Sequence, residues 1–232
     1  MKDKILAIIP ARSGSKGLKN KNIKILNGKP MINYTIEASL ESDIFSNIVV
    51  STDSQKYARI AKKAGAEVPF IRPKKLSNDE STTTEVILHA ITEMEKRKDE
   101  RYDHFMLLQP TSPLRTFENI KAAYSLMKEK NANAIVSVCK TDHNPLWSNT
   151  IDESLSLVDF LDTNENKRRQ ELPTYYRING AIYLSKVNYY KKFNDFYYND
   201  SYAYIMNKRE SIDVDDIIDF KLAEVLMEEN IE

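Results

Sequence analysis

Basic side chains gather in one short segment, directly after the first apolar run of the chain. The stretch ILAIIPARSGSKGLKNKN (5–22) passes from apolar residues into a loop that holds two glycines and the cations Arg12, Lys16 and Lys21. Glycines let backbone N–H groups approach an anion closely, and lysine and arginine neutralise phosphate charge. We therefore expect Arg12, Lys16 and Lys21 to neutralise a bound triphosphate.

This loop matches none of the common glycine-rich motifs. Gly14 and Gly17 are only three positions apart, so both GxxxxGK[ST] and GxGxxG are absent. GSKG could mimic the GxxG loop of an RNA-binding KH module, but that loop joins two helices and this one follows an expected strand. A solvated, lysine-rich turn is the remaining alternative. The position at the carboxyl end of a strand favours a binding site instead.

Paired carboxylates near the other end of the chain could hold a metal ion. In SIDVDD (211–216) an extended backbone would put Asp213 and Asp215 on the same side. Two such oxygen ligands suit Mg²⁺, which keeps several waters and takes its other ligands from substrate phosphates. Helix capping is the alternative, because aspartates favour the N-terminus of the helix that follows. We assign Asp216 and Asp219 to capping or to solvation.

Two further groups could recognise a polar or anionic ligand. Gln109 ends an apolar strand in LLQPTSPLR, and prolines fix the turn behind it. Its amide can donate and accept, which suits an acylamino or hydroxyl group, although a plain strand-to-helix connection is the alternative. Arg168, Arg169 and Arg177 form a second cationic cluster, and a guanidinium can hold a carboxylate bidentately.

The apolar pattern predicts the elements that must position these residues. We expect strands at 5–9, 47–52, 67–71, 104–109, 134–138 and 181–185, helices at 30–42, 54–65, 81–98 and 116–130, and an acidic amphipathic helix at the end of the chain. This alternation predicts an α/β fold with a doubly wound, mainly parallel sheet. Ligands bind beyond the carboxyl ends of such strands, so the loops after Ile9, Thr52 and Gln109 should form the site.

We expect one domain over residues 1–232. The segment at about 140–175 is irregular and polar, and it could be a β-rich excursion that packs on another subunit or forms a lid.

The composition argues against several classes of protein. Basic and acidic residues each total 34, so a general nucleic-acid binder is not expected. Cys139 is the single cysteine and should be buried in a strand, which fits a reducing cytosol. Three scattered histidines and one cysteine do not make a zinc site. No apolar run approaches the length needed to span a membrane. The apolar segment near the N-terminus is also too short for the core of a signal peptide. We therefore expect a cytoplasmic protein.

The segment IPARSGSKGLKNKNI resembles the opening signature of CMP-sialic acid synthetases, the acylneuraminate cytidylyltransferases. Related nonulosonate and KDO cytidylyltransferases share its general form. Five further blocks resemble the same family in the same order: STDS (51–54), RPKKLSND (72–79), LLQPTSPLR (107–115), RRQELPTYYRINGAIYL (168–184) and SIDVDD (211–216). Together they extend over nearly the whole chain.

The resemblance implies a Rossmann-like nucleotidyltransferase fold with a small dimerisation excursion, and a homodimer. It also implies transfer of CMP from CTP to the anomeric hydroxyl of N-acetylneuraminic acid, or of a related nonulosonic acid such as legionaminic acid, with release of pyrophosphate. Mg²⁺ would be the cofactor, held by Asp213 and Asp215. Arg12, Lys16 and Lys21 would be the catalytic cations.

The same resemblance assigns the binding residues. The nucleotide would be held by Arg12, Ser15, Lys16, Lys21, Asn22, Arg72 and Thr83, with Arg72 and Thr83 at the cytosine. The sugar would be held by Gln109, Arg169, Asn179, Tyr183, Phe196 and Tyr197. Arg169 would grip the sugar carboxylate, and the aromatic pair Phe196 and Tyr197 would come from the neighbouring subunit.

One departure bears on the acceptor. The sialic acid synthetases commonly carry a basic residue where this chain has Trp147, in NPLW. The identity of the sugar therefore stays open, and legionaminic acid is one alternative. KDO cytidylyltransferase activity and a catalytically silent sugar-nucleotide binding protein are the rival functions.

Overall fold

The computed structural model describes residues 3–14, 17–161 and 168–228, apart from the side chain of Arg169. The strands are β1 Ile5–Pro10, β2 Ile25–Leu26, β3 Lys29–Pro30, β4 Asn47–Ser51, β5 His104–Leu107, β6 Ala134–Lys140, β7 Tyr176–Lys186 and β8 Ser201–Ile205. The helices are α1 Met31–Ser42, α2 Gln55–Lys63, α3 Thr83–Lys98, α4 Phe117–Glu129, α5 Val187–Phe193 and α6 Ile217–Glu228.

The main sheet has six strands in the order β4-β1-β5-β7-β6-β8. β1 pairs in parallel with β4 and β5, and β6 pairs in parallel with β8, while β7 runs antiparallel to both of its neighbours. The predicted mainly parallel sheet is therefore confirmed, with β7 as the one reversed strand. Because β1, β4 and β5 run in the same direction, the loops that follow them meet at one edge.

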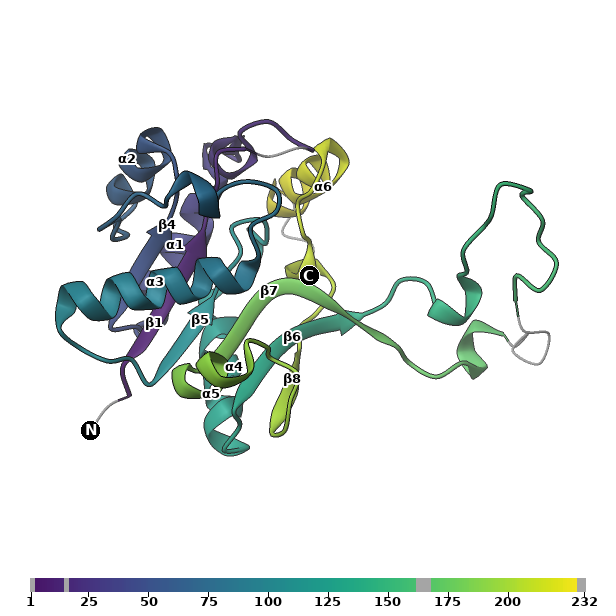
Figure 1. The fold of residues 1–232 in the computed structure, drawn as a ribbon. Coiled ribbons are helices and arrows are strands. Elements are labelled where there is room, and N and C mark those ends of the chain that lie inside the picture. The colour runs from purple at the N-terminus through teal and green to yellow at the C-terminus, as the bar shows by residue number, and fades with distance from the viewer. Residues whose placement is uncertain (1–2, 15–16, 162–167, 229–232) are drawn as a thin grey trace.

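Both faces of the sheet are covered, which explains the continuous apolar strands. Ala7 and Ile9 of β1 belong to a core cluster that also holds residues of α1, α2 and α4. Leu6 and Ile8 point to the opposite face, where the cluster holds residues of α3 and α5. Figure 1 shows α3 lying across the front of the sheet and α1 behind it. The doubly wound arrangement follows from this two-sided burial.

Side-chain caps fix the start of the helices near the site. Ser54 accepts a hydrogen bond from the backbone N–H of Tyr57 at the start of α2. Thr82 and Thr116 begin α3 and α4 with capping boxes. These caps fix the residue at which each loop ends and its helix begins. The side chains of the loops are then available to line a cavity.

Some expectations for the elements were wrong. Residues 67–71 form no strand, and only Glu67 bridges to Val49. Pro69 has no N–H to continue the ladder. β7 begins at Tyr176 rather than at 181, and both α5 and β8 went unpredicted.

A long arm projects from the sheet between β6 and β7 (Figure 1). Its described residues, 141–161 and 168–175, contain no strand, so the excursion is not β-rich there. Five apolar side chains on it are between 43% and 81% exposed: Ile151, Leu155, Leu157, Val158 and Leu161. The arm thus presents apolar surface that this chain leaves uncovered.

None of the helices in the described part of the chain is long and apolar enough to cross a membrane.

Candidate active site

A cavity of about 570 Å³ opens where the loops after β1 and β5 meet the N-terminus of α3. Its lining includes seven of the residues that the sequence nominated: Arg12, Lys21, Asn22, Arg72, Thr83, Gln109 and Asp215. These residues come from four separate segments of the chain. The loops after Ile9 and Gln109 therefore meet as predicted, whereas the loop directly after Thr52 does not line this cavity.

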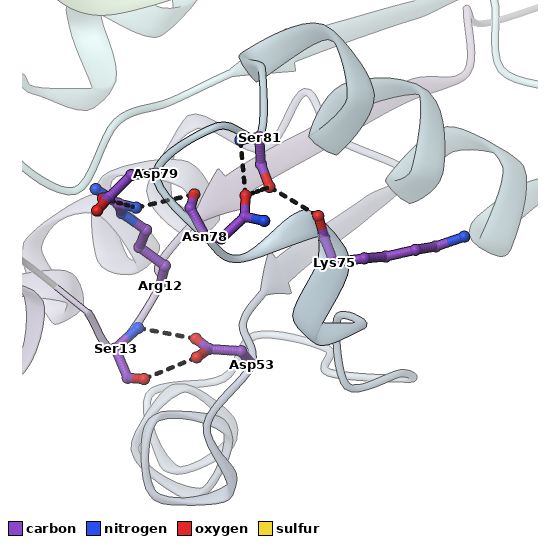
Figure 2. A network of polar contacts seen from close by, with 7 residues as sticks. All are labelled: Arg12, Ser13, Asp53, Lys75, Asn78, Asp79 and Ser81. Carbon is purple, nitrogen blue, oxygen red and sulfur yellow. Dashed lines mark hydrogen bonds and ion pairs between the residues drawn. The ribbon is translucent and has the colours of Figure 1, made fainter.

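Two carboxylates hold the start of the first loop (Figure 2). Arg12 Nη1 donates to the backbone oxygen of Asn78 at 3.0 Å and to Asp79 Oδ1 at 2.8 Å. Ser13 donates its backbone N–H and its hydroxyl to the two oxygens of Asp53, both at 2.8 Å. Ser15 and Lys16 lie outside the described residues. Among the expected phosphate ligands, Arg12 is thus already paired with protein oxygens.

The far end of the first loop contacts the segment before α6. Lys21 Nζ lies 2.8 Å from Asp215 Oδ1. Beside it, an ideal Cβ on Gly17 would come within 2.6 Å of the carbonyl oxygen of Asp215. Only glycine allows this close approach of the two backbones. The approach brings Lys21, which is expected to bind phosphate, next to Asp215, which is expected to bind the metal.

Arg72 and Asn22 line the cavity, and both carry buried polar atoms without a hydrogen-bond partner in the described part of the chain. Nε and Nη2 of Arg72 and Oδ1 of Asn22 have no hydrogen-bond partner in the described part of the chain. Burial lowers the pKa of Arg72, and the nearby Asp53 carboxylate opposes that shift. Thr83, the first residue of α3, lies on the same wall. A base that both donates and accepts hydrogen bonds would satisfy these atoms.

Gln109 and Asp213 meet at Gly180 in β7. An ideal Cβ on Gly180 would lie 3.0 Å from Gln109 Oε1 and 3.2 Å from Asp213 Oδ2. Gly180 has a φ of +76°, which favours glycine. Arg115 secures this arrangement from behind, because its Nη1 donates to the carbonyl oxygens of Gln109 and Ala181. The expected sugar and metal residues therefore adjoin each other.

The aspartate pair fits a divalent cation. Oδ1 of Asp213 is buried with no hydrogen-bond partner in the described residues, and burial raises the pKa of this carboxyl group, partly opposed by a hydrogen bond with Thr111. A cation would compensate that buried charge. The described residues contain no group of three or more histidine, cysteine, aspartate or glutamate side chains that could hold a metal. Two carboxylates with substrate phosphates and water would form a site of the kind Mg²⁺ prefers.

The neighbouring aspartates cap α6, as predicted. Asp219 Oδ2 accepts from the backbone N–H groups of Asp215 and Asp216, at 2.9 and 3.1 Å. Asp216 Oδ1 accepts from Ile218 and Asp219 in return. These contacts hold the loop that carries the metal candidates.

Tyr183 lies near the aspartate pair, beneath an aromatic cluster of its own chain. Burial raises its pKa to about 12, with smaller contributions from Tyr197 and Asp213. Its ring lies 5.2 Å from that of Phe196, which is buried in the core. Phe196 therefore supports Tyr183 within this chain, whereas Tyr197 is 56% exposed.

The remaining sugar candidates are placed less directly. Asn179 is buried, and its amide bonds to Ser137, Ser211 and Met206. These contacts use its hydrogen-bonding capacity to support β7 instead of the cavity. Arg169 begins the short 3₁₀ helix Arg169–Glu171 in the arm, and its side chain lies outside the described part.

Sequence reasoning missed Asp53 and Asp79 as partners of the first loop. Asp53 lies in a strand-end loop that was marked for chemistry, so its position was the available signal. Asp79 gave none, because its contact with Arg12 spans 67 positions.

Comparison with known proteins agrees with this geometry. The model of a family described as cytidylyltransferase matches residues 6–230. An N-acylneuraminate cytidylyltransferase of Escherichia coli O18:K1:H7 is 39% identical over 224 residues, which are 96% of this chain and 52% of that protein. A CMP-N,N'-diacetyllegionaminic acid synthase of Legionella pneumophila is 37% identical over 234 residues, which are 98% of this chain and 97% of that protein.

A solved structure has the same fold. It is a CMP:2-keto-3-deoxy-manno-octonic acid synthetase complexed with CTP, with a TM-score of 0.73 at 16% identity over 97% of this chain and 99% of that one. The present chain spans about half the length of the E. coli relative and nearly all of the Legionella one. With its Rossmann-like sheet and the family match over residues 6–230, the chain belongs to the cytidylyltransferase family.

Proposed function

We propose that this protein transfers CMP from CTP to the anomeric hydroxyl of a nonulosonic acid and releases pyrophosphate. The observation that most supports this proposal concerns Arg72 and Asn22. Both carry buried polar atoms that are unpaired within the described residues, and both line the same cavity as the cationic loop and Gln109. A base, a triphosphate and an acceptor could thus be held together. Family membership, with relatives named for sialic and legionaminic acids, supports the acceptor class.

The nucleotide would be bound at both of its ends. Arg72, Asn22 and Thr83 would hold the base and ribose, and the buried guanidinium of Arg72 would donate to a carbonyl oxygen of cytosine. Arg12, Ser15, Lys16 and Lys21 would take the triphosphate. To do so, Arg12 would exchange Asp79 for a phosphate, and Lys21 would turn from Asp215. Both residues would then stabilise charge on the leaving pyrophosphate.

We propose Mg²⁺ as the cofactor and Asp213 and Asp215 as the residues that would hold it. When bound, Mg²⁺ neutralises phosphate charge and lowers the pKa of an attacking hydroxyl. Lys21 orients Asp215 before binding, and the capping contacts of Asp219 hold the backbone of the same segment. The chain thereby holds the Asp215 carboxylate in place before substrate arrives.

The sugar would lie against Gln109 and Tyr183. The Gln109 amide would read an acylamino or hydroxyl group, and Tyr183 would donate as a neutral phenol because its pKa is raised to about 12. Arg169 is the proposed ligand of the sugar carboxylate. Asn179 and Phe196 would act by supporting β7 and Tyr183, and Tyr197 would contribute from the exposed side.

We also propose that the protein is a cytoplasmic homodimer. The exposed apolar side chains of the arm would pack on a second copy of the chain. The single cysteine, which is buried and free, suits a reducing compartment.

Pyrophosphate release tests the proposal. The protein is given CTP and Mg²⁺ with N-acetylneuraminic acid, legionaminic acid or KDO in separate reactions, and UTP replaces CTP as the control. Release with CTP and either nine-carbon acid supports the assignment. Release with KDO alone would move the protein to the KDO cytidylyltransferases. CTP binding without release from any of these acids would favour a silent binding protein.

A further inference from the structure

Asp53 lies just beyond β4, next to the start of the cationic loop (Figure 2). Its two carboxylate oxygens accept from the backbone N–H and the hydroxyl of Ser13, each at 2.8 Å. Asp53 itself does not line the cavity. It therefore acts on the loop without contacting the space where a ligand would lie.

These contacts extend the pairing of β1 with β4 beyond the end of the sheet. The last backbone bond of the parallel ladder runs from the N–H of Ala11 to the oxygen of Ser51, at 2.9 Å. Two residues further on, the N–H of Ser13 points the same way and meets the Asp53 side chain in place of a backbone carbonyl. The Asp53 side chain thus stays hydrogen-bonded to the segment that follows β1, at the point where the backbones of the two segments separate.

The neighbouring residues of the loop are held as well. Asn22 Nδ2 donates to the backbone oxygen of Arg12 at 3.3 Å. With Ala11, Arg12 and Ser13 tied in sequence, the point at which the loop leaves the sheet is fixed. The direction in which the Arg12 side chain enters the cavity depends on that point.

The charge of Asp53 is unfavourable in this place for a protein that binds a polyanion. A carboxylate beside a phosphate-binding loop repels the phosphates, with an energy that depends on distance and screening. The Asp53 carboxylate also lies near the buried Arg72 guanidinium, but it favours triphosphate binding only if its geometry offsets the repulsion. Two short hydrogen bonds to one residue, one of them to the backbone, supply that geometry.

We propose that Asp53 is a positioning residue for triphosphate binding: it anchors the cationic loop through Ser13, so that Arg12 enters the cavity already oriented. This inference rests on the proposed function, since it assigns the loop to the phosphates of CTP. The contacts of Asp53 with Ser13 do not involve Arg72, although the Asp53 carboxylate lies near enough to Arg72 to oppose the lowering of its pKa.

Three variants separate hydrogen bonding from charge. Asp53→Asn keeps the shape, because its amide oxygen accepts from the Ser13 N–H and its NH₂ donates to the hydroxyl, which accepts as readily as it donates. Asp53→Ala removes both contacts. Ser13→Ala removes the hydroxyl contact alone and leaves the charge. Thermal melting establishes that each variant is folded.

The first measurement is binding of inorganic triphosphate and of cytidine, each by calorimetry, together with KM for CTP and kcat. In Asp53→Ala we expect triphosphate affinity to fall at least about tenfold, with Ser13→Ala intermediate and Asp53→Asn within about threefold of wild type. Cytidine affinity should be unchanged in Ser13→Ala, which leaves the Asp53 charge near Arg72 in place. Equal losses of triphosphate affinity in Asp53→Asn and Asp53→Ala would overturn the proposal. Wild-type triphosphate binding in Asp53→Ala would overturn it too, as would a loss of cytidine affinity in Ser13→Ala that matches its loss of triphosphate affinity.

The second measurement needs no ligand. Amide hydrogen exchange of the peptide that contains Ser13 should be faster in Asp53→Ala than in wild type and close to wild type in Asp53→Asn, with other peptides unaffected. Exchange that is identical in Asp53→Ala and wild type would refute the anchor. If the wild-type protein bound neither CTP nor triphosphate, the proposed function would fail, and this exchange experiment would still decide whether Asp53 holds the loop.

Discussion

The Nζ atom of Lys21 lies 2.8 Å from Oδ1 of Asp215, across 194 positions of sequence. This ion pair joins the cationic loop after β1 to the segment that leads into α6. A residue expected at the phosphates and a residue expected at the metal are thus in contact before either ligand binds. The lysine side chain is mostly buried there, whereas the carboxylate is 75% exposed and open to a cation.

Asp215→Asn should raise the Mg²⁺ requirement. The variant keeps a hydrogen-bond acceptor for Lys21 but loses the charge that attracts a cation, so the Mg²⁺ concentration for half-maximal pyrophosphate release should rise at least about tenfold. Asp216→Asn is the matched control, because Asp216 caps α6 and asparagine caps a helix about as well. Identical Mg²⁺ titrations of Asp215→Asn and wild type would remove Asp215 from the metal site.

Asp213→Asn should stabilise the metal-free protein at neutral pH while it abolishes turnover. Burial raises the pKa of Asp213 in the folded state, so ionisation of this group costs folding stability. That cost is absent below the unfolded pKa of about 3.9 and is fully present above the raised folded value. The Tm advantage of the variant, measured in EDTA, should therefore shrink as the pH falls from 7 towards 4. An advantage that does not change with pH would contradict this account.

Gly180→Ala should impair the acceptor more than the nucleotide. The new methyl group would meet Gln109 Oε1 and Asp213 Oδ2 at 3.0 and 3.2 Å, so kcat should fall and KM for the sugar should rise while KM for CTP stays near wild type. Gly28→Ala is the control, since Gly28 also has a positive φ, of +85°, but open space around its Cβ position. It should lose stability alone. A Gly180→Ala enzyme with wild-type sugar kinetics would show that Gln109 and Asp213 tolerate the displacement.

Asp79→Asn should tighten CTP binding. In the free protein Asp79 pairs with Arg12, which must leave it to reach a phosphate. The pair is partly exposed, and exposed pairs contribute about 0–1 kcal/mol, so KM for CTP should fall by up to about fivefold. Glu80→Gln removes the same charge from the next residue and serves as the control. If both variants lower KM equally, the effect is one of net charge and not of competition for Arg12.

The double change Leu155→Ser with Val158→Ser should convert the proposed dimer to monomer. Both side chains are exposed on the arm, at 76% and 81%, and removal of their apolar surface takes away the attraction between copies. Sedimentation velocity gives the mass of each species. Leu40→Ser, at an exposed site on α1, is the control and should leave the mass unchanged. A wild-type protein that sediments as a monomer would refute the dimer itself.

Local signals in the sequence were sufficient for much of the scaffold. The helices predicted at 54–65 and 81–98 form as α2 and α3, and β1 and β4 occupy the expected apolar runs. The strand predicted at 67–71 failed because Pro69 interrupts the ladder. β8 is a five-residue strand at the edge of the sheet, and its side chains are exposed or half-buried, so it lacks the buried apolar face on which strand prediction depends.

Sequence by itself determined the α/β class, the family resemblance and the residue types of the site, because these depend on periodicity and on motifs read within a few residues. The tertiary structure alone decided which of those residues meet. Gly180, Gln109 and Asp213 adjoin only because β7 is reversed between β5 and β6. Likewise, Arg12 contacts Asp79 and Ser13 contacts Asp53, although these pairs are 67 and 40 positions apart in the sequence. Such contacts arise from packing of the whole sheet, and no local pattern carries them.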